Sequence, residues 1–239
     1  KRAALNHYFQ NLNTPQQQAV FHVNGPVLVL AGAGSGKTTA MIHRIVQMIH
    51  FGDGWVQANA SITKEDAAYL KDYIADKQPA DLERLCSILA VQPIQPWHIL
   101  AITFTNKAAN ELRSRLLQAI GEECASMLHA STFHSACVRI LRRSISKLGY
   151  DSNFTIYDTD DSQRLMKSCI ADADVSEKQF PPRAVLTEIS LAKDRMCSPE
   201  YFCIEAGSDY RKMVIGKLYK EYQNRLKSAN ALDFDDLIY

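Results

Sequence analysis

A short glycine-rich segment carries the residue types and the spacing that bind phosphate groups. It occupies positions 31–39, between the apolar run 27–30 and a helical pattern over about 37–49. Its members are Ala31, Gly32, Ala33, Gly34, Ser35, Gly36, Lys37, Thr38 and Thr39. Glycines let backbone N–H groups turn toward phosphate oxygens, and the start of the following helix adds partial positive charge. In such a loop Lys37 reaches the β- and γ-phosphates, and the Thr38 hydroxyl binds Mg²⁺.

These residues predict a P-loop that binds a nucleoside triphosphate with Mg²⁺, in which Lys37 and Thr38 take part in catalysis. The alternative is a flexible turn between a strand and a helix that binds no ligand. Ala31 stands where a P-loop usually has its first glycine, which is a mild departure. Three glycines, the Gly-Lys-Thr sequence and both flanking elements favour the nucleotide site over the plain turn.

The strands and helices around this loop must hold it in place, and the sequence predicts that they alternate along the chain. Short apolar runs predict buried parallel strands at 27–30 and 99–104, with a weaker strand at 130–133. A helical pattern follows each strand. These patterns cover about 37–49, about 108–120, and a stretch that ends at Leu148. Such alternation predicts a parallel sheet of the α/β class.

Two regions depart from this alternation. The polar stretch 52–96 separates the first two strand–helix units, and nothing in it carries recognisable chemistry. After Tyr150 the pattern becomes mainly helical, which predicts a second, helical domain. Residues typical of helix starts mark several of the helices predicted in these two regions. They are Thr63, Asp158, Pro181 and Ser198.

The overall charge gives no support for a nucleic-acid partner, because 27 Lys and Arg residues face 26 Asp and Glu residues. Such a partner must therefore be argued from local sites. No apolar run approaches the roughly 20 residues needed to cross a bilayer, and the first residues lack a signal-peptide pattern. The six cysteines form no Cys-x-x-Cys pair, so no zinc or redox motif is indicated. We expect a cytoplasmic protein with reduced thiols, without zinc and without a membrane partner.

Several segments, taken in order, resemble the N-terminal motifs of UvrD/Rep/PcrA-type superfamily 1 DNA helicases. They are LNTPQQQAV (12–20), AGAGSGKTT (31–39), ILAITFTNKAANELRSRL (99–116), ASTFHSACVRILRR (130–143) and ALDFDDLI (231–238). FTIYDTDDSQRLMK (154–167) also resembles the start of that family's helical 1B subdomain. The resemblance covers nearly the whole chain, but the stretch 52–96 departs from it because these helicases have a much shorter loop there.

The resemblance implies an ATP-dependent motor that moves 3′ to 5′ on single-stranded DNA, splits duplexes at junctions and clamps ATP between two RecA-like domains. It implies a RecA-like P-loop NTPase sheet with an inserted, mainly helical subdomain. Residues 1–133 would be the first part of ATP-binding domain 1A, with an insertion at about 52–96. Residues 134–229 would be subdomain 1B, and residues 230–239 the start of the return to domain 1A.

The same resemblance assigns roles to residues outside the phosphate loop. Gln16 matches the glutamine that reads adenine, and a carboxamide offers one donor and one acceptor to the adenine edge. Without the resemblance, a surface glutamine in a glutamine-rich turn is the better interpretation. Two further segments match motifs that contact single-stranded DNA. They are Phe104, Thr105, Asn106 and Lys107 in the first, and Thr132, Phe133 and His134 in the second.

Physical chemistry supports the first of these DNA assignments. Phe104 closes a predicted parallel strand, and ligands of such sheets bind at the carboxyl ends of the strands. Bases stack on aromatic rings without sequence preference. The alternatives are that Phe104 is a core residue and that His134 is structural. Arg139, Arg142 and Arg143 either meet the DNA backbone or form a solvated helix face.

The acid that hydrolysis requires is missing from the sequence. An apolar strand ending in Asp-Glu would order Mg²⁺ and activate water, and no such element occurs. Asp233, Asp235 and Asp236 follow only two apolar residues, so a helix-cap and structural role is favoured for them. We expect a fragment of a longer helicase, cut before the catalytic acid, that binds ATP–Mg²⁺ and single-stranded DNA but needs the missing portion for hydrolysis.

Three alternatives to this interpretation stay open. The chain could belong to the motor of a helicase–nuclease. It could be a nucleotide-gated DNA-binding module that does not unwind duplexes. It could also belong to a P-loop ATPase that acts on something other than nucleic acid, although the segments around Phe104 and His134 argue against this.

Overall fold

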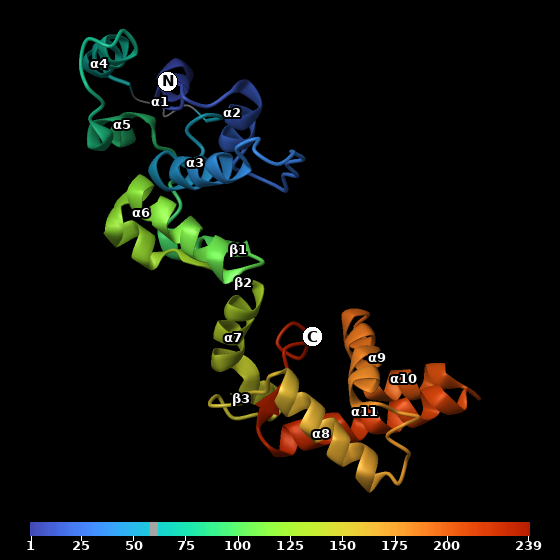
Figure 1. Cartoon of the computed structure of the whole chain (residues 1–239). Coiled ribbons are helices and arrows are strands. Elements are labelled where there is room, and N and C mark those ends of the chain that lie inside the picture. The colour runs from blue at the N-terminus through green and yellow to red at the C-terminus, as the bar shows by residue number, and fades with distance from the viewer. Residues whose placement is uncertain (58–61) are drawn as a thin grey trace. The chain divides into compact units, whose positions relative to one another are not determined.

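The computed structural model describes residues 1–57 and 62–239, which form two compact units (Figure 1). Unit 1 comprises Lys1–Thr132 and unit 2 comprises Phe133–Tyr239. The stretch 52–96, predicted as an insertion, includes residues 58–61, which lie outside the described part of the chain.

Unit 1 combines helices with a two-stranded parallel sheet. Its elements are α1 (Arg2–Tyr8), α2 (Thr14–Phe21), α3 (Lys37–His50), α4 (Lys64–Ile74), α5 (Leu82–Leu89), the 3₁₀ helix η1 (Pro96–His98), β1 (Leu100–Thr103), α6 (Asn106–Met127) and β2 (His129–Thr132). Helices α4 and α5 each begin after a residue that caps them. The side chains of Thr63 and Asp81 accept hydrogen bonds from backbone N–H groups of the first turn.

The strands β1 and β2 and the helix α6 between them form one strand–helix–strand unit (Figure 1). The strands pair in parallel, with Leu100 opposite His129 and Thr103 opposite Thr132. Helix α6 packs against both strands with one apolar face. The buried residues of that face are Ala109, Leu112, Leu116 and Ile120. Two of the three predicted strands, and their parallel pairing, are therefore confirmed.

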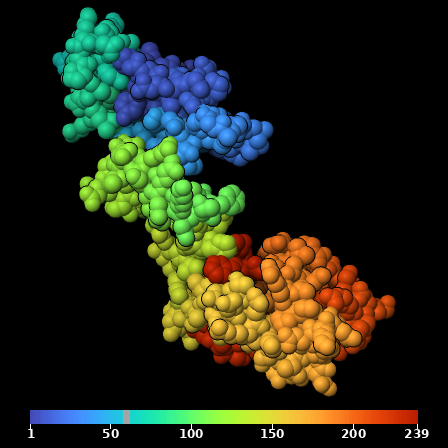
Figure 2. Space-filling view, in the orientation of Figure 1, coloured from blue at the N-terminus to red at the C-terminus, as the bar shows by residue number. Residues whose placement is uncertain are grey.

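The segment 27–30, predicted as a third strand, forms no strand among the described residues. This segment is irregular, and its four apolar side chains are exposed, with Leu28 at 83% and Leu30 at 85%. In the space-filling view this blue part of the chain lies at the surface of unit 1 (Figure 2). A strand forms only when a neighbour satisfies its backbone groups. Among the described residues, β1 pairs only with β2, and neither strand pairs with residues 27–30.

The polar stretch contributes directly to the core of unit 1. Leu70 and Tyr73 of α4 and Leu85 and Leu89 of α5 are buried in the same apolar cluster as Phe51. Burial of a large apolar side chain is worth about 1.5–3 kcal/mol. We conclude that α4 and α5 are part of the folded unit, although the sequence offered no role for them.

Unit 2 is mainly helical, as predicted for the second half of the chain. Its elements are α7 (Phe133–Ser144), the 3₁₀ helix η2 (Ile145–Leu148), β3 (Thr155–Ile156), α8 (Thr159–Asp172), α9 (Pro182–Asp194), α10 (Pro199–Ala206), α11 (Tyr210–Ser228) and β4 (Ala231–Leu232). Asp158 and Ser198 cap α8 and α10 with side-chain hydrogen bonds, which confirms two predicted helix starts. Helix α11 supplies the centre of the core with Tyr219, Tyr222 and Leu226.

The last residues of the chain pack within unit 2. Strand β4 pairs in parallel with β3, so that Ala231 lies opposite Thr155 and Leu232 lies opposite Ile156. Leu232 and Leu237 join a small apolar cluster with Phe154. The sequence had predicted that residues 230–239 begin a return to the nucleotide-binding domain, and this stays a prediction.

Three further observations bear on partners. Among the described residues, no helix is both long enough and apolar enough to cross a membrane. All six cysteines are free thiols. The described residues also bring no group of three or more His, Cys, Asp or Glu side chains into a metal-binding arrangement.

Candidate functional site

The phosphate loop ends where helix α3 begins, at Lys37. Gly36 adopts left-handed backbone angles, with φ 80° and ψ 25°, and Gly34 has φ 75°. A Cβ atom at Gly36 would lie only 2.4 Å from the side-chain nitrogen of Gln16. Glycine is therefore favoured at position 36 by its backbone conformation, and the end of the Gln16 side chain would have to shift to admit a Cβ atom there.

The Lys37 side chain folds over the loop that precedes it. Its Nζ donates hydrogen bonds to the carbonyl oxygens of Ala31 and Gly32, at 2.8 and 2.6 Å. The Ser35 hydroxyl donates to the same Gly32 carbonyl at 2.7 Å. The ammonium charge thus lies at the N-terminus of a 14-residue helix, where the helix dipole adds further positive potential. This is an electrostatic setting that attracts a phosphate anion.

Gln16 lies directly against this loop. Its Nε2 donates to the carbonyl oxygen of Ser35 at 3.1 Å, and its Oε1 accepts from the Asn13 backbone N–H at 3.1 Å. A carboxamide has two N–H groups and two lone pairs on oxygen. One donor and one acceptor of Gln16 are used within the protein, so one of each remains for a ligand. Gln16 therefore contacts the phosphate loop and takes part in the capping box of α2, and its role toward adenine stays a prediction.

A cavity of about 330 Å³ lies beside Gln16 and Lys37. Its walls combine polar side chains with small apolar ones. They include Asn13, Pro15, Gln16, Leu30, Ser35 and Lys37. A cavity that pairs an apolar wall with a few polar groups is typical of small-molecule sites. Gln16 and Lys37 therefore line one cavity together with the loop residues Ala31, Ser35 and Gly36, and nucleotide binding there stays a prediction.

Arg44 is a supporting residue that sequence reasoning missed. Its guanidinium, on α3, donates to the carbonyl oxygens of Ala19 at 2.6 Å, of His22 and of Val23 at 3.4 Å. It therefore satisfies carbonyl groups at the C-terminal end of α2 and joins α2 to α3. Because α2 carries Gln16 and α3 follows the loop, Arg44 fixes the spacing between them. Its acceptors lie 21 to 25 residues away in sequence, and no local pattern signals that pairing.

A second predicted site begins where β1 ends. Phe104 follows the strand directly and is 89% exposed, so the core alternative for this residue is wrong. The Thr105 hydroxyl accepts a hydrogen bond from the Ala108 backbone N–H at 3.2 Å, which caps α6. Asn106 and Lys107 open that helix. The segment thus holds an aromatic ring at the carboxyl end of a parallel strand, beside the N-terminus of a helix.

Thr132, from the other predicted DNA segment, ends β2 opposite Thr103. Because the strands are parallel, Thr132 lies at the same edge of the sheet as the start of the Phe104 segment. Phe133 and His134 are the first residues of α7 in unit 2. The half-buried His134 ring contacts Phe234 edge to face, with ring centroids 5.4 Å apart.

The exposed side chain of Arg142 makes a contact that the sequence did not suggest, and the two roles considered for it stay open. Its guanidinium lies 4.0 Å from the centroid of the Phe154 ring and donates to the Ser152 carbonyl oxygen at 2.5 Å. The side chain thus covers part of the small apolar cluster of unit 2. A cation over an aromatic ring contributes about 0.5–1 kcal/mol at an exposed site.

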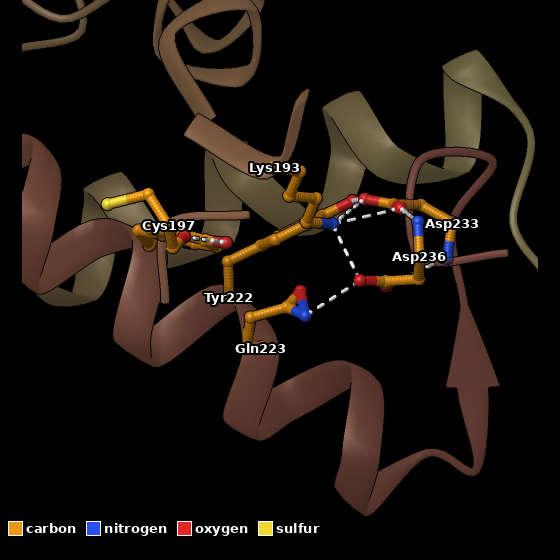
Figure 3. Close-up of polar contacts among 7 residues, drawn as sticks. Lys193, Cys197, Tyr222, Gln223, Asp233 and Asp236 are labelled. Carbon is orange, nitrogen blue, oxygen red and sulfur yellow. Dashed lines mark hydrogen bonds and ion pairs between the residues drawn. The ribbon is translucent and has the colours of Figure 1, made fainter. Parts of the chain in front are cut away.

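The acids near the end of the chain form a buried charge cluster with a residue that the sequence did not single out (Figure 3). Lys193 of α9, whose side chain is 1% exposed, lies 2.8 Å from carboxylate oxygens of both Asp233 and Asp236. Tyr222 donates to Asp233 at 3.0 Å, and Gln223 donates to Asp236 at 2.8 Å. The structural role predicted for these acids is therefore observed for Asp233 and Asp236, although as a buried ion-pair cluster and not as a helix cap.

One ammonium group cannot fully compensate two buried carboxylates. Burial raises the pKa of Asp236 to about 6, and the neighbouring Asp233 adds to the increase while Lys193 opposes it. Burial acts against the charge of Lys193, but the two carboxylates outweigh it and raise the Lys193 pKa. Burial and the Asp233 charge also raise the pKa of Tyr222, which therefore stays a protonated donor.

Comparison with known proteins places these segments in a family context. The family model described as the UvrD/REP helicase N-terminal domain matches residues 12–60 and 82–239. The residues between the two matched ranges, 61–81, include α4 and fall within the stretch predicted as an insertion.

Similar sequences occur among curated proteins. The chain is 39% identical over 233 residues to the ATP-dependent DNA helicase PcrA of Bacillus subtilis (strain 168). It is 37% identical over 234 residues to the PcrA of Staphylococcus epidermidis (strain ATCC 12228 / FDA PCI 1200), and 36% identical over 236 residues to the PcrA of Staphylococcus aureus (strain COL). These matches cover 98–99% of this chain but only 26% of each relative. The chain thus spans about a quarter of the length of the curated relatives it matches.

Proposed function

The chain belongs to the UvrD/REP helicase family through its N-terminal domain, and from this premise we propose that it supplies the ATP-binding and DNA-contacting part of a motor that moves 3′ to 5′ on single-stranded DNA. One observation carries the proposal. Lys37 and Gln16 both contact the loop 31–36 and line one cavity at the N-terminus of α3. A strand-to-helix turn that binds no ligand would not need Gln16 and Lys37 to meet at one cavity.

ATP would bind with its phosphates on the loop and its base beside Gln16. The backbone N–H groups of residues 32–38 and the Lys37 ammonium would hold the phosphates. The remaining donor and acceptor of Gln16 would pair with the adenine edge. Lys37 would exchange the carbonyl groups of Ala31 and Gly32 for phosphate oxygens, which are stronger partners because they are charged.

The residues present are compatible with Mg²⁺ bound through the nucleotide. Thr38 lies exposed in the first turn of α3 and offers a hydroxyl oxygen, a ligand type that Mg²⁺ accepts. The other ligands would be phosphate oxygens and water, because Mg²⁺ is usually bound by few protein groups. Bound there, Mg²⁺ would neutralise charge on the phosphate groups.

Single-stranded DNA would contact the edge of the sheet where β1 and β2 end. Phe104 offers an exposed ring on which a base can stack, at about 1–3 kcal/mol. Lys107 and the first turn of α6 would meet the backbone phosphates, as would Thr105 and Asn106. Thr132 ends the neighbouring strand, and Phe133 and His134 continue from it.

We also propose that residues 27–30 form a strand of a larger, RecA-like sheet in the whole protein. Two observations support this. The segment leads directly into the phosphate loop, and its four apolar side chains are exposed in the chain as described. Contiguous exposed apolar residues usually mark a surface that another element covers. Hydrogen exchange in the whole protein should then show protected amides at 27–30, whereas rapid exchange there would contradict the strand.

Hydrolysis would need groups from the rest of the protein. The sequence contains no apolar strand ending in Asp-Glu, so we propose that the acid that activates water lies elsewhere in the protein. The chain alone should bind ATP and turn it over very slowly. If the whole protein binds ATP but does not hydrolyse it, the nucleotide-gated DNA-binding module would be favoured instead.

The test measures three activities of the whole protein, with and without the change Lys37→Ala. We expect ATP turnover stimulated by single-stranded DNA, movement along it, and unwinding of a duplex that carries a 3′ single-stranded tail, all abolished by the change. If single-stranded DNA stimulates ATP turnover but no duplex is unwound, the proposal would be limited to a translocase. DNA binding gated by ATP, with no turnover, would replace the proposal with the binding module.

A further inference from the structure

The turn that carries Phe234 is held by the buried charge cluster of unit 2, and Phe234 in turn contacts His134. Lys193 anchors the two acids that flank this turn, Asp233 and Asp236, at 2.8 Å each. The acids also close the turn on themselves. Asp236 N–H donates to the Asp233 carboxylate at 2.8 Å, and Asp233 N–H donates to the Asp236 carboxylate at 3.2 Å. Both ends of the turn are therefore fixed.

Phe234 is presented on this turn and is 49% exposed. Its ring meets the His134 ring edge to face, at 5.4 Å between centroids and an interplanar angle of 71°. An aromatic pair of this geometry restricts the orientation of both rings. The path from Lys193 to His134 therefore runs through two short ion pairs, one closed turn and one ring contact, all within unit 2 (Figure 3 shows the ion pairs).

The turn packs on one side only: Leu232 and Leu237 beside it are buried in the small apolar cluster of unit 2, and a cavity lies on another side. A cavity of about 340 Å³ lies against it, lined by Asp233, Phe234 and Asp235 and, across from them, by Leu186 and Ser190 of α9. The cavity leaves space beside Phe234 and Asp235 into which these residues could shift if the anchor were lost. The ion pairs with Lys193 add a directional restraint to the packing of Leu232 and Leu237.

A buried cluster of this kind is poorly explained by stability. Replacing buried ion pairs by apolar side chains of similar volume is often neutral or stabilising, because desolvation of the charges offsets their attraction. This cluster also buries one cation with two carboxylates, which increases that cost. Its geometry is better explained if the cluster fixes the position of the turn.

We infer that Lys193, through Asp233, Asp236 and Phe234, is a positioning residue that orients His134 for contact with single-stranded DNA. The inference rests on the proposed function, because the DNA contact of His134 belongs to that proposal. Lys193 itself is buried and touches no DNA; it acts only by fixing the ring against which His134 packs. The partner class is the nucleic-acid backbone, whose phosphate oxygens accept hydrogen bonds from an imidazole N–H.

The test is a double-mutant cycle in the whole protein, read as the dissociation constant for a fluorescent oligothymidine. Lys193→Met alone would leave two buried carboxylates uncompensated and could prevent folding. The working variant therefore carries Lys193→Met, Asp233→Asn and Asp236→Asn together, which removes all three charges and nearly keeps the volumes. The matched control carries Lys167→Met and Glu177→Gln, which removes an exposed ion pair in the same unit.

We expect His134→Ala to weaken DNA binding about tenfold in the natural background and less than about twofold in the neutralised variant. The neutralised variant should itself bind DNA about tenfold more weakly, while the control variant and the affinity for Mg-ADP stay unchanged. Phe234→Ala should match the neutralised variant, and Phe234→Tyr should restore binding. A purely structural role for Lys193 would not abolish the effect of His134→Ala.

Three results would overturn the inference, and they can be told apart. If the neutralised variant folds and binds DNA normally, Lys193 does not position His134. If His134→Ala has no effect while Phe104→Ala weakens binding, the inference fails and the proposed DNA site stands. If neither change affects binding, the proposed function fails as well.

Discussion

The side-chain nitrogen of Gln16 donates a 3.1 Å hydrogen bond to the backbone carbonyl oxygen of Ser35, and this bond joins helix α2 to the phosphate loop. The same side chain accepts the Asn13 backbone N–H, which closes the capping box of α2. Gln16 is thus held at both ends of its carboxamide, 19 residues from the loop that it contacts. A side chain restrained in this way loses little conformational freedom when it binds a ligand.

Replacing Gln16 by Ala should weaken Mg-ADP binding by about tenfold, because one neutral hydrogen bond is worth about 1 kcal/mol and the loop loses its contact with α2 as well. Gln16→Glu should keep the bond from Asn13 but lose the donor to Ser35 and to adenine. Calorimetry with ADP and GDP would check this, with Gln18→Ala on the same helix as the control. An unchanged preference for ADP over GDP in Gln16→Glu would contradict the adenine role.

Lys37→Ala should weaken Mg-ADP binding about tenfold or more, since a hydrogen bond to a charged group is worth about 1.5–3 kcal/mol. The fold should be unaffected, because the Lys37 side chain is exposed and donates to carbonyl groups of its own loop. Calorimetry on this variant and on Lys64→Ala, an exposed lysine at the start of α4, would separate a site-specific loss from a general loss of charge. Equal affinity in the two variants would refute the phosphate contact.

Gly36→Ala should destabilise unit 1 and disturb the loop, whereas Gly32→Ala should have little effect on stability. Left-handed backbone costs a non-glycine residue about 1–2 kcal/mol, and the new Cβ would lie 2.4 Å from Gln16 Nε2. At Gly32 a Cβ would meet nothing within 4 Å. Tryptophan fluorescence during thermal unfolding would compare them, because both tryptophans lie in unit 1. Equal stability of the two variants would contradict this reading of Gly36.

Local patterns predicted the parts of the fold that depend on local physics. Thr63, Asp158 and Ser198 were expected to start helices because their side chains can accept first-turn N–H groups, and each does so. The spacing of Ala109 and Leu112 predicted the buried face of α6. These signals depend on residues within one or two helical turns, so one sequence suffices to see them.

Features that depend on distant partners could not be predicted in this way. The run 27–30 has the composition of a buried strand, but a strand exists only with a neighbour, and the composition does not say which neighbour is present. Lys193 pairs with Asp233 across 40 residues, and a lysine inside a helical pattern carries no signal of burial. For Gln16 the residue type alone favoured a surface position, and only the family resemblance pointed to the loop.

Phe104→Ala in the whole protein should weaken binding of single-stranded DNA by about 1–3 kcal/mol, the usual contribution of one base stacked on an aromatic ring. Trp97→Ala is the matched control, because Trp97 is another exposed aromatic residue of unit 1 and lies outside the predicted DNA segments. Fluorescence anisotropy at two salt concentrations would measure both variants. The salt dependence should be the same in both, since neither change removes a charge. Equal losses in both variants would contradict a specific stacking role for Phe104.

The stability of unit 2 should fall as the pH rises from about 4 to about 6, because of Asp236. Burial raises the pKa of this carboxyl from 3.8 to about 6 in the folded chain. Within that interval the folded state holds a proton that the unfolded state has lost, so a rise in pH favours unfolding, by about 1.4 kcal/mol per pH unit at most. Above the folded pKa both states are ionised and the trend ends.

Asp236→Asn should remove this trend, because asparagine does not titrate. Urea unfolding followed by circular dichroism at pH 4, 5, 6 and 7 would measure it, with tryptophan fluorescence reporting separately on unit 1. The free energy of unfolding of the natural chain minus that of Asp236→Asn should decrease between pH 4 and 6 and then stay level. Asp194→Asn, an exposed acid at the end of α9, should leave the trend in place. A difference that rises with pH would show that the attraction of Lys193 outweighs burial at Asp236.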